Sequence, residues 1–500
     1  MDKSLTLIDL AFLALESQAQ TGHVGGVAIF KLPKGAKADF FRRAVETHSD
    51  WRRAAGFFRL ILRRKGIGLG WVEAGQVDVE SHIQYLALPE PGSRRQLYTL
   101  AGRLHMQPLN RLHPLWEVAF IDGLEGGRGA IYIKVHHALV DGISAIRLLL
   151  STLSSSPDDA SRLLWHAQPP QRQSSNDEER EGSHGVMPKF SSIIEGVVEA
   201  APVAATETFR SLLYAAGVRN GPQVSTFMAP RTIFNRQITN RRQFASSDLS
   251  LSEVRAVAKE AGATVNDVVL MICASALRRY LLDQHALPET PLTTWMPIST
   301  RREGDTRPSN QIAMTCVSLA TNVADPRARF HAIRASAEAA KQDTLTRSPE
   351  ANNWLALLRG SLPLVTDLLG INEFVAPATN LTISNVPGLN QEFFFHGAKL
   401  EVIYPLSVLV GTVGLNITLL SCGDTLGVGL LACPDTVPEL EKLAGYLGDA
   451  FAEFRQMVEA SLESRRVRKG SGSATASVAS TRAGRPRSQG MRVTFPHASD

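Results

Sequence analysis

The chain predicts an α/β fold, and three observations carry this prediction. Apolar residues alternate along residues 129–137 (Gly-Ala-Ile-Tyr-Ile-Lys-Val-His-His), which is the period of a strand. Two helix starts pair a hydroxyl cap with an acid three residues later, at Ser250–Glu253 and Thr264–Asp267. With 500 residues, 44% of them hydrophobic, the chain is long enough for a large core and two domains.

The first part of the chain is expected to alternate helix and strand. It opens with a helix, followed by a strand at His23–Phe30. The strand at residues 129–137 ends in a pair of histidines. After Gly142, apolar residues recur at helical spacing over residues 143–150, so a helix is expected there.

The middle of the chain changes character twice. Ser154–Gly185 is rich in proline, serine and charge, which predicts a linker. Pro188–Val218 is apolar and is expected to be helical, with a break near Pro202. We expect these helices mainly to pack on the body of the protein, and one face could meet lipid.

The second part begins near Phe244 and again alternates helices with strands. The capped helix from Ser250 should end at Gly262, and a second helix should start at Thr264. Nineteen residues without charge, Val402–Leu420, raise the possibility of a transmembrane helix. Proline, glycines and β-branched residues in this segment favour two buried strands with a turn near Gly411–Gly414, so no membrane span is predicted.

The charge of the chain is concentrated at its C-terminal end. From Ser464 onward there are eight basic residues and one acid, Asp500, so the rest of the chain carries about −2 of the total of +5. A near-neutral body disfavours nucleic-acid binding, and the Ser-, Gly- and Arg-rich tail predicts a disordered, solvated segment. The four cysteines lack CxxC spacing, which favours a reducing compartment.

The most informative segment is His136-His137-Ala-Leu-Val-Asp141-Gly142. A histidine can accept and return a proton near neutral pH, a nearby carboxylate can orient it, and glycine permits a tight turn. By strand alternation His137 continues the apolar face, which makes it the better candidate for a buried general base. No cluster of Cys or His at ligand spacing accompanies the pair, so no metal is predicted.

This segment matches the HHxxxDG signature of CoA-dependent acyltransferases related to chloramphenicol acetyltransferase. Further blocks follow in order along about residues 5–455, and together with the signature they resemble the bacterial wax ester synthase/acyl-CoA:diacylglycerol acyltransferase family. These blocks are IDLAFLALES (Ile8–Ser17), HVGGVAIFKLP (His23–Pro33), PLNRLHPLWEVAFIDGL (Pro108–Leu124), VNDVVL (Val265–Leu270), PISTR (Pro297–Arg301), NLTISNVPG (Asn380–Gly388) and GLNIT (Gly414–Thr418).

The resemblance implies two chloramphenicol acetyltransferase-like α/β domains with mixed sheets, joined by a long, partly helical linker. The domains are expected at residues 1–155 and 244–460, with the linker and apolar helical segment at 156–243. A disordered basic tail is expected at 461–500. The channel for acyl transfer would lie between the two domains.

The resemblance also implies an activity, the transfer of a fatty acyl group from acyl-CoA to a long-chain alcohol or a diacylglycerol. His137 would take the hydroxyl proton and return it to the leaving thiolate, so no covalent intermediate and no cofactor are expected; acyl-CoA is a substrate. The expected partners are lipid substrates, without nucleic acid. The expected location is the cytoplasm, in peripheral contact with the inner face of the membrane or with lipid inclusions.

Other site residues follow from the same resemblance. Asp141 is expected to be architectural, paired with Arg301 and followed by the turn at Gly142. Candidates for the oxyanion donor or for substrate contact are His136, Asn266, Asp267, Ser384, Asn385 and Trp116. Asp267 also fits a simple capping role, Asn385 a turn before Val-Pro-Gly, and Trp116 the core.

Two alternatives stay open from the sequence. The first is an acyltransferase that uses short or other alcohols. The second is a lipid-binding protein of the same fold without turnover, against which the intact His137 and Asp141 argue.

Overall fold

The computed structural model describes residues 5, 7–65, 68–140, 142–159, 161–167, 229–299, 312–347, 374–389 and 391–478, and single residues 352, 355, 366 and 370. The chain divides into two compact units, Met1–Phe454 and Arg455–Asp500, and the two large sheets belong to the first unit. Asp141, Arg301 and most of the predicted linker, residues 168–228, lie outside the described residues.

The first sheet is six-stranded and mixed. Its two central strands, β1 (His23–Lys31) and β6 (Arg128–His136), pair antiparallel, with His23 opposite His136. Among the described strands of this sheet, β4 and β5 are the one parallel pair. The remaining strands in order from the two edges are β11 (Phe394–Phe395) and β12 (Ala398–Leu406) beside β1, and β4 (Ile83–Ala87) and β5 (Trp116–Leu124) beside β6.

The helices predicted around this sheet are present. α1 (Leu7–Leu15) precedes β1, and α4 (Gly142–Thr152) follows the histidine pair, as the sequence predicts. α3 (Arg94–Met106) starts with a reciprocal capping box between Ser93 and Gln96, a pattern that fixes helix starts. The other elements of this part are α2 (Phe40–Glu46) and a hairpin of β2 (Leu60–Lys65) and β3 (Gly68–Glu73).

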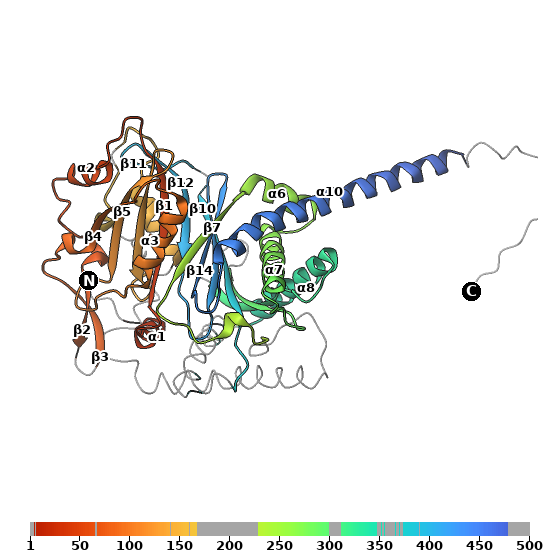
Figure 1. Cartoon of the computed structure of the whole chain (residues 1–500), viewed down its shortest axis with the longest axis horizontal. Helices are drawn as coiled ribbons and strands as arrows, with labels where there is room; N and C mark the ends of the chain where they lie inside the picture. Colours follow the sequence, from red (N-terminus) through yellow and green to blue (C-terminus); the bar gives the residue numbers. More distant parts are fainter. Residues whose placement is uncertain are drawn as a thin grey trace, which may run out of the picture. The chain divides into compact units, whose positions relative to one another are not determined.

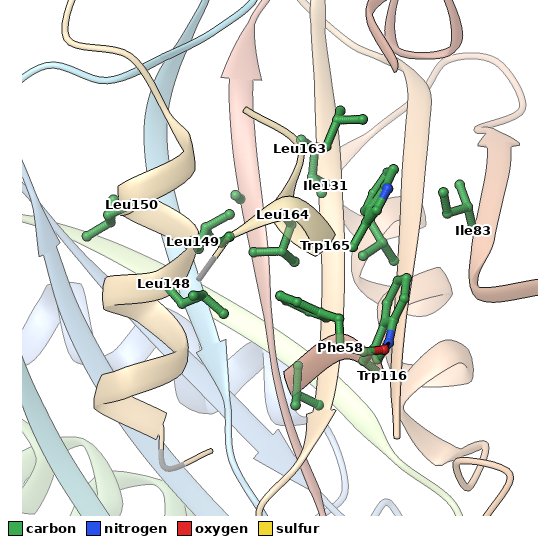
Figure 2. Packing of buried hydrophobic residues seen from close by; sticks show 14 of the residues in the cluster. Phe58, Ile83, Trp116, Ile131, Leu148, Leu149, Leu150, Leu163, Leu164 and Trp165 are labelled. Atoms are coloured by element: carbon green, nitrogen blue, oxygen red, sulfur yellow. Dashed lines mark hydrogen bonds between the residues drawn. The ribbon is translucent and has the colours of Figure 1, made fainter. Parts of the chain in front are cut away.

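Both faces of the first sheet are buried. On one face, Ile131 and Val135 of β6 belong to a core with Trp116, Trp165 and the leucines of α4 (Figure 2). On the other face, Tyr132 packs in a second core with residues of α3. A central strand covered on both sides carries no hydrophobic-in, polar-out alternation of burial, which matters for the histidine pair below.

The second sheet is also six-stranded and mixed. Its strand order is β7 (Gln243–Ser250), β14 (Thr425–Ala432), β13 (Leu415–Cys422), β10 (Leu381–Leu389), β8 (Thr293–Ser299) and β9 (Ile312–Ser318), with parallel pairs β13–β10 and β10–β8. Among the residues that the structure describes, the helices of this part are α6 (Leu251–Glu260), α7 (Val265–Asp283) and α8 (Pro326–Leu345) (Figure 1).

The caps predicted for these helices are confirmed. The Ser250 hydroxyl accepts from the backbone N–H of Glu253, and Thr264 and Asp267 form a reciprocal capping box. The uncharged segment Val402–Leu420 forms β12 and β13 with a turn between them, as predicted. Among the described residues no single helix has the length and apolarity to cross a membrane, although α6 and α7 pass that test as a pair bent by 101°.

The two sheets meet where β12 crosses β14. A side chain at Gly429 would place its Cβ 2.2 Å from the carbonyl oxygen of Pro405, so only glycine allows this approach. The predicted fold class, two α/β parts with mixed sheets, is confirmed. The first sheet, however, also contains β11 and β12, which come from the second half of the chain.

The last described element is α10 (Leu440–Val478), within which the first compact unit ends at Phe454. The helix continues through residues 461–478, where the composition predicts disorder. Helix propagation from an established turn is inexpensive for the Glu, Arg and Lys residues within 461–469. Residues 479–500 lie outside the described residues. The predicted domain boundaries stay a prediction.

Candidate active site

The histidine pair stands at the end of β6, where its backbone is held from both sides. The N–H of His136 donates to the carbonyl of Leu115 at 3.0 Å, just before β5 begins. The N–H of His137 donates to the carbonyl of Gly22 at 2.9 Å, just before β1 begins. The N–H of Leu139 then donates to the His136 carbonyl at 2.9 Å, which closes a turn. The residues directly before the two neighbouring strands therefore fix the backbone positions of both histidines.

His136 is completely buried, and its hydrogen bond defines its tautomer. The backbone N–H of Ala138 donates to Nδ1 of His136 at 3.1 Å. Because a backbone N–H can only donate, Nδ1 must carry the lone pair, and the ring proton lies on Nε2. Protonating Nδ1 would break the bond that shapes the turn. His136 is thus suited to hold the turn rather than to exchange protons.

Nε2 of His136 faces a buried carboxylate, Glu16, whose Oε2 lies 3.8 Å away. This is ion-pair range rather than hydrogen-bond range. Arg111 donates from Nε to the same oxygen at 2.8 Å, and the N–H of Gly22 donates to Oε1 at 3.2 Å. Burial opposes ionisation of Glu16, but His136, Arg111 and the Gly22 N–H outweigh it and lower its pKa to about 2. Glu16 is therefore ionised at neutral pH.

Gly22 permits the close approach of this segment to His136. A Cβ at residue 22 would lie 2.6 Å from Nε2 of His136. At the same residue, the N–H bonds Glu16 and the carbonyl receives the N–H of His137. One glycine thus links the carboxylate, the buried ring and the backbone of the second histidine.

His137 is half-buried, and Phe12 of α1 covers its ring. The ring centroids are 4.0 Å apart with an interplanar angle of 15°, a stacked arrangement that fixes the plane of the imidazole. The prediction that His137 would be the more buried of the pair is wrong, since His136 has no exposed surface. The reason is that both faces of β6 are covered, so alternation does not separate them. Partial exposure suits a group that must meet a substrate.

A buried polar layer lies beside the pair, on the face of α3. Nε2 of His23 bonds the carbonyl of His105 at 2.8 Å, and Nδ1 of His105 bonds the Tyr132 hydroxyl at 2.9 Å. Burial lowers the pKa of His105 to about 3 and that of His23 well below its usual value, so both rings are neutral at pH 7. Lys134, also fully buried, pairs with Glu117 at 2.9 Å. These groups support the end of β6 on the face of the sheet that α3 covers.

Trp116, a candidate for substrate contact, is a core residue in the structure. It is 1% exposed, and its indole N–H donates to the carbonyl of Phe58 at 2.9 Å. Its ring stacks on His82 and lies parallel to Trp165 (Figure 2). Its neighbour Leu115 supplies the carbonyl that holds His136. The sequence block Pro108–Leu124 therefore contributes to the site through the backbone carbonyl of Leu115.

Asn266 and Asp267 lie in the first turn of α7. The side-chain amide of Asn266 contacts the sulfur of Met296 at 3.2 Å and is partly buried. Asp267 accepts from the N–H of Thr264 at 2.9 Å and from its hydroxyl at 2.8 Å, the capping role that the sequence allowed. Arg334 lies 4.0 Å from the same carboxylate. None of these described contacts reaches the histidine pair.

Ser384 and Asn385 lie on β10, both half-buried, opposite Thr418 and Leu419 of β13. The turn expected at Val386-Pro387-Gly388 is wrong, because β10 continues to Leu389 with only a local irregularity in its pairing. The N–H of Gly388 donates to the Ser421 hydroxyl at 3.0 Å, so the chain stays attached to the sheet.

Two predicted residues lie outside the described part of the chain, Asp141 and Arg301, so their pairing stays a prediction. Gly142 is the first residue of α4. Within the described residues, no group of three or more His, Cys, Asp or Glu side chains is placed to hold a metal ion.

The sequence reasoning missed the partners of the histidines. Phe12 and Glu16 both lie in the block Ile8–Ser17, and Arg111 lies in the block Pro108–Leu124. An acid directly after an apolar helix, followed six residues later by a glycine, was the only available signal. Without knowing that α1 lies against the end of β6, that signal does not point to His136.

Two mixed sheets with a histidine pair at the end of a central strand place this chain in the class of proteins with the fold of condensation domains. The first condensation domain of the calcium-dependent antibiotic synthetase shares this fold, with a TM-score of 0.52 at 14% identity over 92% of this chain and 96% of that one.

Closer relatives identify the family. Residues 5–269 match the wax ester synthase/diacylglycerol acyltransferase catalytic domain, and residues 309–455 match the WS/DGAT C-terminal domain. The chain is 34% identical to the O-acyltransferase WSD of Acinetobacter baylyi over 90% of this chain and 96% of that one. It is 35% identical to a putative diacylglycerol O-acyltransferase of Mycobacterium tuberculosis over 90% and 99%.

A solved structure supports the same family. The wax ester synthase/diacylglycerol acyltransferase from Marinobacter aquaeolei VT8 superimposes with a TM-score of 0.72 at 32% identity, covering 91% of this chain and all of that one. The chain belongs to the wax ester synthase/diacylglycerol acyltransferase family.

Proposed function

We propose that this enzyme moves a fatty acyl group from acyl-CoA to the hydroxyl of a long-chain alcohol or a diacylglycerol, with His137 as general base. Family membership supports the reaction class. The observation that supports the choice of base is the hydrogen bond from Ala138 to Nδ1 of His136. It gives His136 a fixed structural role and leaves the half-buried His137 as the imidazole that can meet a substrate.

The chemistry requires one proton to move twice. A ring nitrogen of His137 takes the proton of the acceptor hydroxyl as its oxygen attacks the thioester carbonyl. When the tetrahedral intermediate collapses, the C–S bond breaks and the imidazolium returns the proton to the thiolate. A thiol pKa of about 8.5 makes the thiolate a good leaving group, so neither a covalent intermediate nor a cofactor is needed. The face of Phe12 stabilises the imidazolium formed in between.

The oxyanion donor stays a prediction, but the structure disfavours one candidate. In His136, Nδ1 accepts from the N–H of Ala138, and Nε2 is buried 3.8 Å from Glu16 without a hydrogen-bond partner among the described residues. The ring has no exposed surface at which an oxyanion could form. Asn266, Ser384 and Asn385 are the remaining candidates.

We also propose peripheral contact with a membrane or lipid inclusion on the cytoplasmic side, because the ester product and the long-chain or diacylglycerol acceptor are insoluble in water. Leu112, next to Arg111, is 68% exposed, and Phe374 is 85% exposed. An exposed apolar side chain can insert into a lipid interface. Leu112→Ser with Phe374→Ser should reduce co-sedimentation with phospholipid vesicles and leave turnover of a dispersed substrate intact; unchanged sedimentation would exclude these two side chains as anchors.

The test of the reaction is CoA release from palmitoyl-CoA, measured as free thiol, with hexadecanol, a diacylglycerol or a short alcohol as acceptor. His137→Ala should reduce turnover by about 10²- to 10⁴-fold, the contribution of a general acid–base, and should stay folded. Release that favours short alcohols would support the alternative acceptor class. Absence of release with every acceptor, with retained binding of fatty acyl chains, would support the lipid-binding alternative.

A further inference from the structure

The hairpin of β2 and β3 forms a two-stranded sheet of its own, separate from the two large sheets (Figure 1). Where β2 begins and β3 ends, Leu60, Leu62 and Trp71 are buried in the core on one face of the first sheet. Toward the turn the burial ends, because Arg64 is exposed and Leu69, its partner across the two strands, is 48% exposed. The hairpin is therefore held in the core at one end and exposes side chains at the other, the outer end (residues 63–65 and 68–70).

The outer end carries positive charge without a balancing acid. Residues 63–65 are three cations in succession, and the next acid along the chain is Glu73. Arg63 and Arg64 are both exposed, and neither forms an ion pair within the described part of the chain. Arg59, just before β2, lies 2.8 Å from Glu73. An ion pair therefore closes the held end of the hairpin, and the outer end keeps an excess of positive charge.

The register of the hairpin places no acid across from any of these cations. The pairs across the two strands are Arg63–Gly70, Arg64–Leu69 and Lys65–Gly68. Opposite charges across two strands would stabilise the hairpin, whereas glycine offers no side chain to pair with and weakens a strand. Because a two-stranded hairpin is only marginally stable, this pairing costs local stability and leaves the arginines available to a partner.

We propose that the outer end of this hairpin docks on an anionic phospholipid surface, with Arg63 and Arg64 at the headgroup phosphates and Leu69 in the apolar layer beneath them. The inference rests on the proposed function, whose acceptor and product are held in lipid. Successive side chains of a strand point to opposite faces, so the two arginines flank the hairpin on both sides, which suits an end-on approach. Guanidinium groups match phosphate oxygens well.

The composition of the outer end favours a lipid surface over a nucleic acid. Both are polyanions, but the body of the chain is near-neutral and has no extended basic surface run. Leu69 shares a face with Arg64, and an exposed leucine contributes nothing to a phosphate backbone. Basic side chains beside an apolar one are typical of segments that lie in a membrane interface. The hairpin would thus add charge to the apolar contacts proposed for Leu112 and Phe374.

Sedimentation of the full-length enzyme with vesicles tests the inference without depending on turnover. One kind of vesicle is phosphatidylcholine alone, and the other contains equal amounts of phosphatidylcholine and phosphatidylglycerol. Arg63→Gln with Arg64→Gln should weaken binding to the phosphatidylglycerol vesicles by about 30-fold, roughly fivefold for each cation, and leave binding to phosphatidylcholine unchanged. Leu69→Ser should weaken binding to both kinds of vesicle.

Two further variants separate charge at the hairpin from charge in general. Arg63→Lys with Arg64→Lys keeps both charges and should keep most of the binding to phosphatidylglycerol vesicles. Arg327→Gln with Lys341→Gln removes the same charge from exposed positions on α8 and should bind like the wild type.

Turnover supplies an independent readout. With diacylglycerol presented in phosphatidylglycerol vesicles, Arg63→Gln with Arg64→Gln should raise the apparent KM for the acceptor by about 30-fold and leave kcat unchanged. With hexadecanol dispersed in neutral detergent, the same variant should behave like the wild type.

Three results would overturn the inference. The first is equal binding of the wild type to both kinds of vesicle, and the second is unchanged binding in the variant that lacks both arginines. The third is a defect of that variant confined to a DNA fragment, which would mark a surface for nucleic acid. If the wild type binds phosphatidylglycerol vesicles through these arginines but releases no CoA with any acceptor, the proposed function fails and the assignment of the hairpin stands.

Discussion

Replacing Glu16 by glutamine tests the arrangement around His136. The substitution keeps the size of the side chain and removes its charge. In the wild type the carboxylate, 8% exposed, lies 2.7 Å from a guanidinium nitrogen of Arg111 and 3.8 Å from Nε2 of His136. In the variant the Arg111 cation loses its charged partner. An NH₂ group also replaces one of the two carboxylate oxygens, so either Arg111 or the N–H of Gly22 loses its acceptor.

The expected loss of stability in Glu16→Gln follows from the shift in the pKa of Glu16. The pKa of Glu16 falls from an ordinary 4.5 to about 2 on folding. Each unit corresponds to about 1.4 kcal/mol, so ionised Glu16 stabilises the fold by about 3 kcal/mol at pH 7, in line with the loss of one partner of a buried pair. Because the pKa is depressed, this stabilisation is complete above pH 4.5 and is lost as the pH falls through 2. At pH 3 about 1 kcal/mol is left.

The assay is the free energy of unfolding of wild type and Glu16→Gln in denaturant at pH 7 and pH 3. The difference between the two proteins should narrow by about 2 kcal/mol at the lower pH. Glu80→Gln is the matched control, since Glu80 forms an ion pair with Arg52 on the surface, where such pairs contribute about 0–1 kcal/mol. At pH 7, kcat of Glu16→Gln should fall by about 10- to 100-fold, because His137 is held through the same segment.

Two outcomes would refute the reasoning. If the stability difference between wild type and Glu16→Gln is the same at pH 7 and pH 3, the carboxylate is not held ionised by its buried partners. If stability falls but kcat does not, Glu16 supports the fold without positioning His137.

Four other substitutions separate the roles in the site. Gly22→Ala should destabilise the enzyme by about 1–3 kcal/mol and lower kcat, since the new Cβ collides with His136; a normal melting temperature would contradict the 2.6 Å approach. His136→Asn keeps an acceptor where Nδ1 stands and should retain more turnover than His137→Asn, whereas equal losses would remove the distinction between the two rings. Asp141→Ala should lower both soluble yield and activity, and full activity with unchanged melting would exclude an architectural role. Asp267→Ala should cost about 1 kcal/mol of stability through its lost cap, and a large rise in KM without that cost would place it at the substrate instead.

Local patterns in the sequence predicted the elements that local physics decides. The helix caps at Ser250 and Thr264, and the strand that ends at His136, depend on residues within four positions of one another. The turn that follows the pair depends on the Ala138 N–H, two residues away. For these features the residues that make the structure are neighbours in the chain, so a pattern is sufficient.

Patterns failed where the decisive neighbour is distant in sequence. The Val386-Pro387-Gly388 signal predicts a turn, but β10 continues because Ser421 of β13 bonds the N–H of Gly388. Glu16 lies 120 positions before its partner His136, and nothing in either segment shows that they meet. The burial of the histidines was predicted wrongly for the same reason, since only the tertiary structure shows that both faces of β6 are covered.

The two histidines have similar chemistry, so their roles must come from their surroundings. His136 has no exposed surface, its Nδ1 is engaged by a backbone donor, and its Nε2 faces an ionised carboxylate. A ring held in this way keeps one tautomer. It also packs against Glu16 and Gly22, and Gly22 in turn holds the backbone N–H of His137. His137 takes its backbone position from Gly22 and its ring plane from Phe12, and it keeps partial exposure. A base that must meet two substrates and exchange a proton with each needs that combination of fixed orientation and access, and a rigid neighbour supplies the first without sacrificing the second.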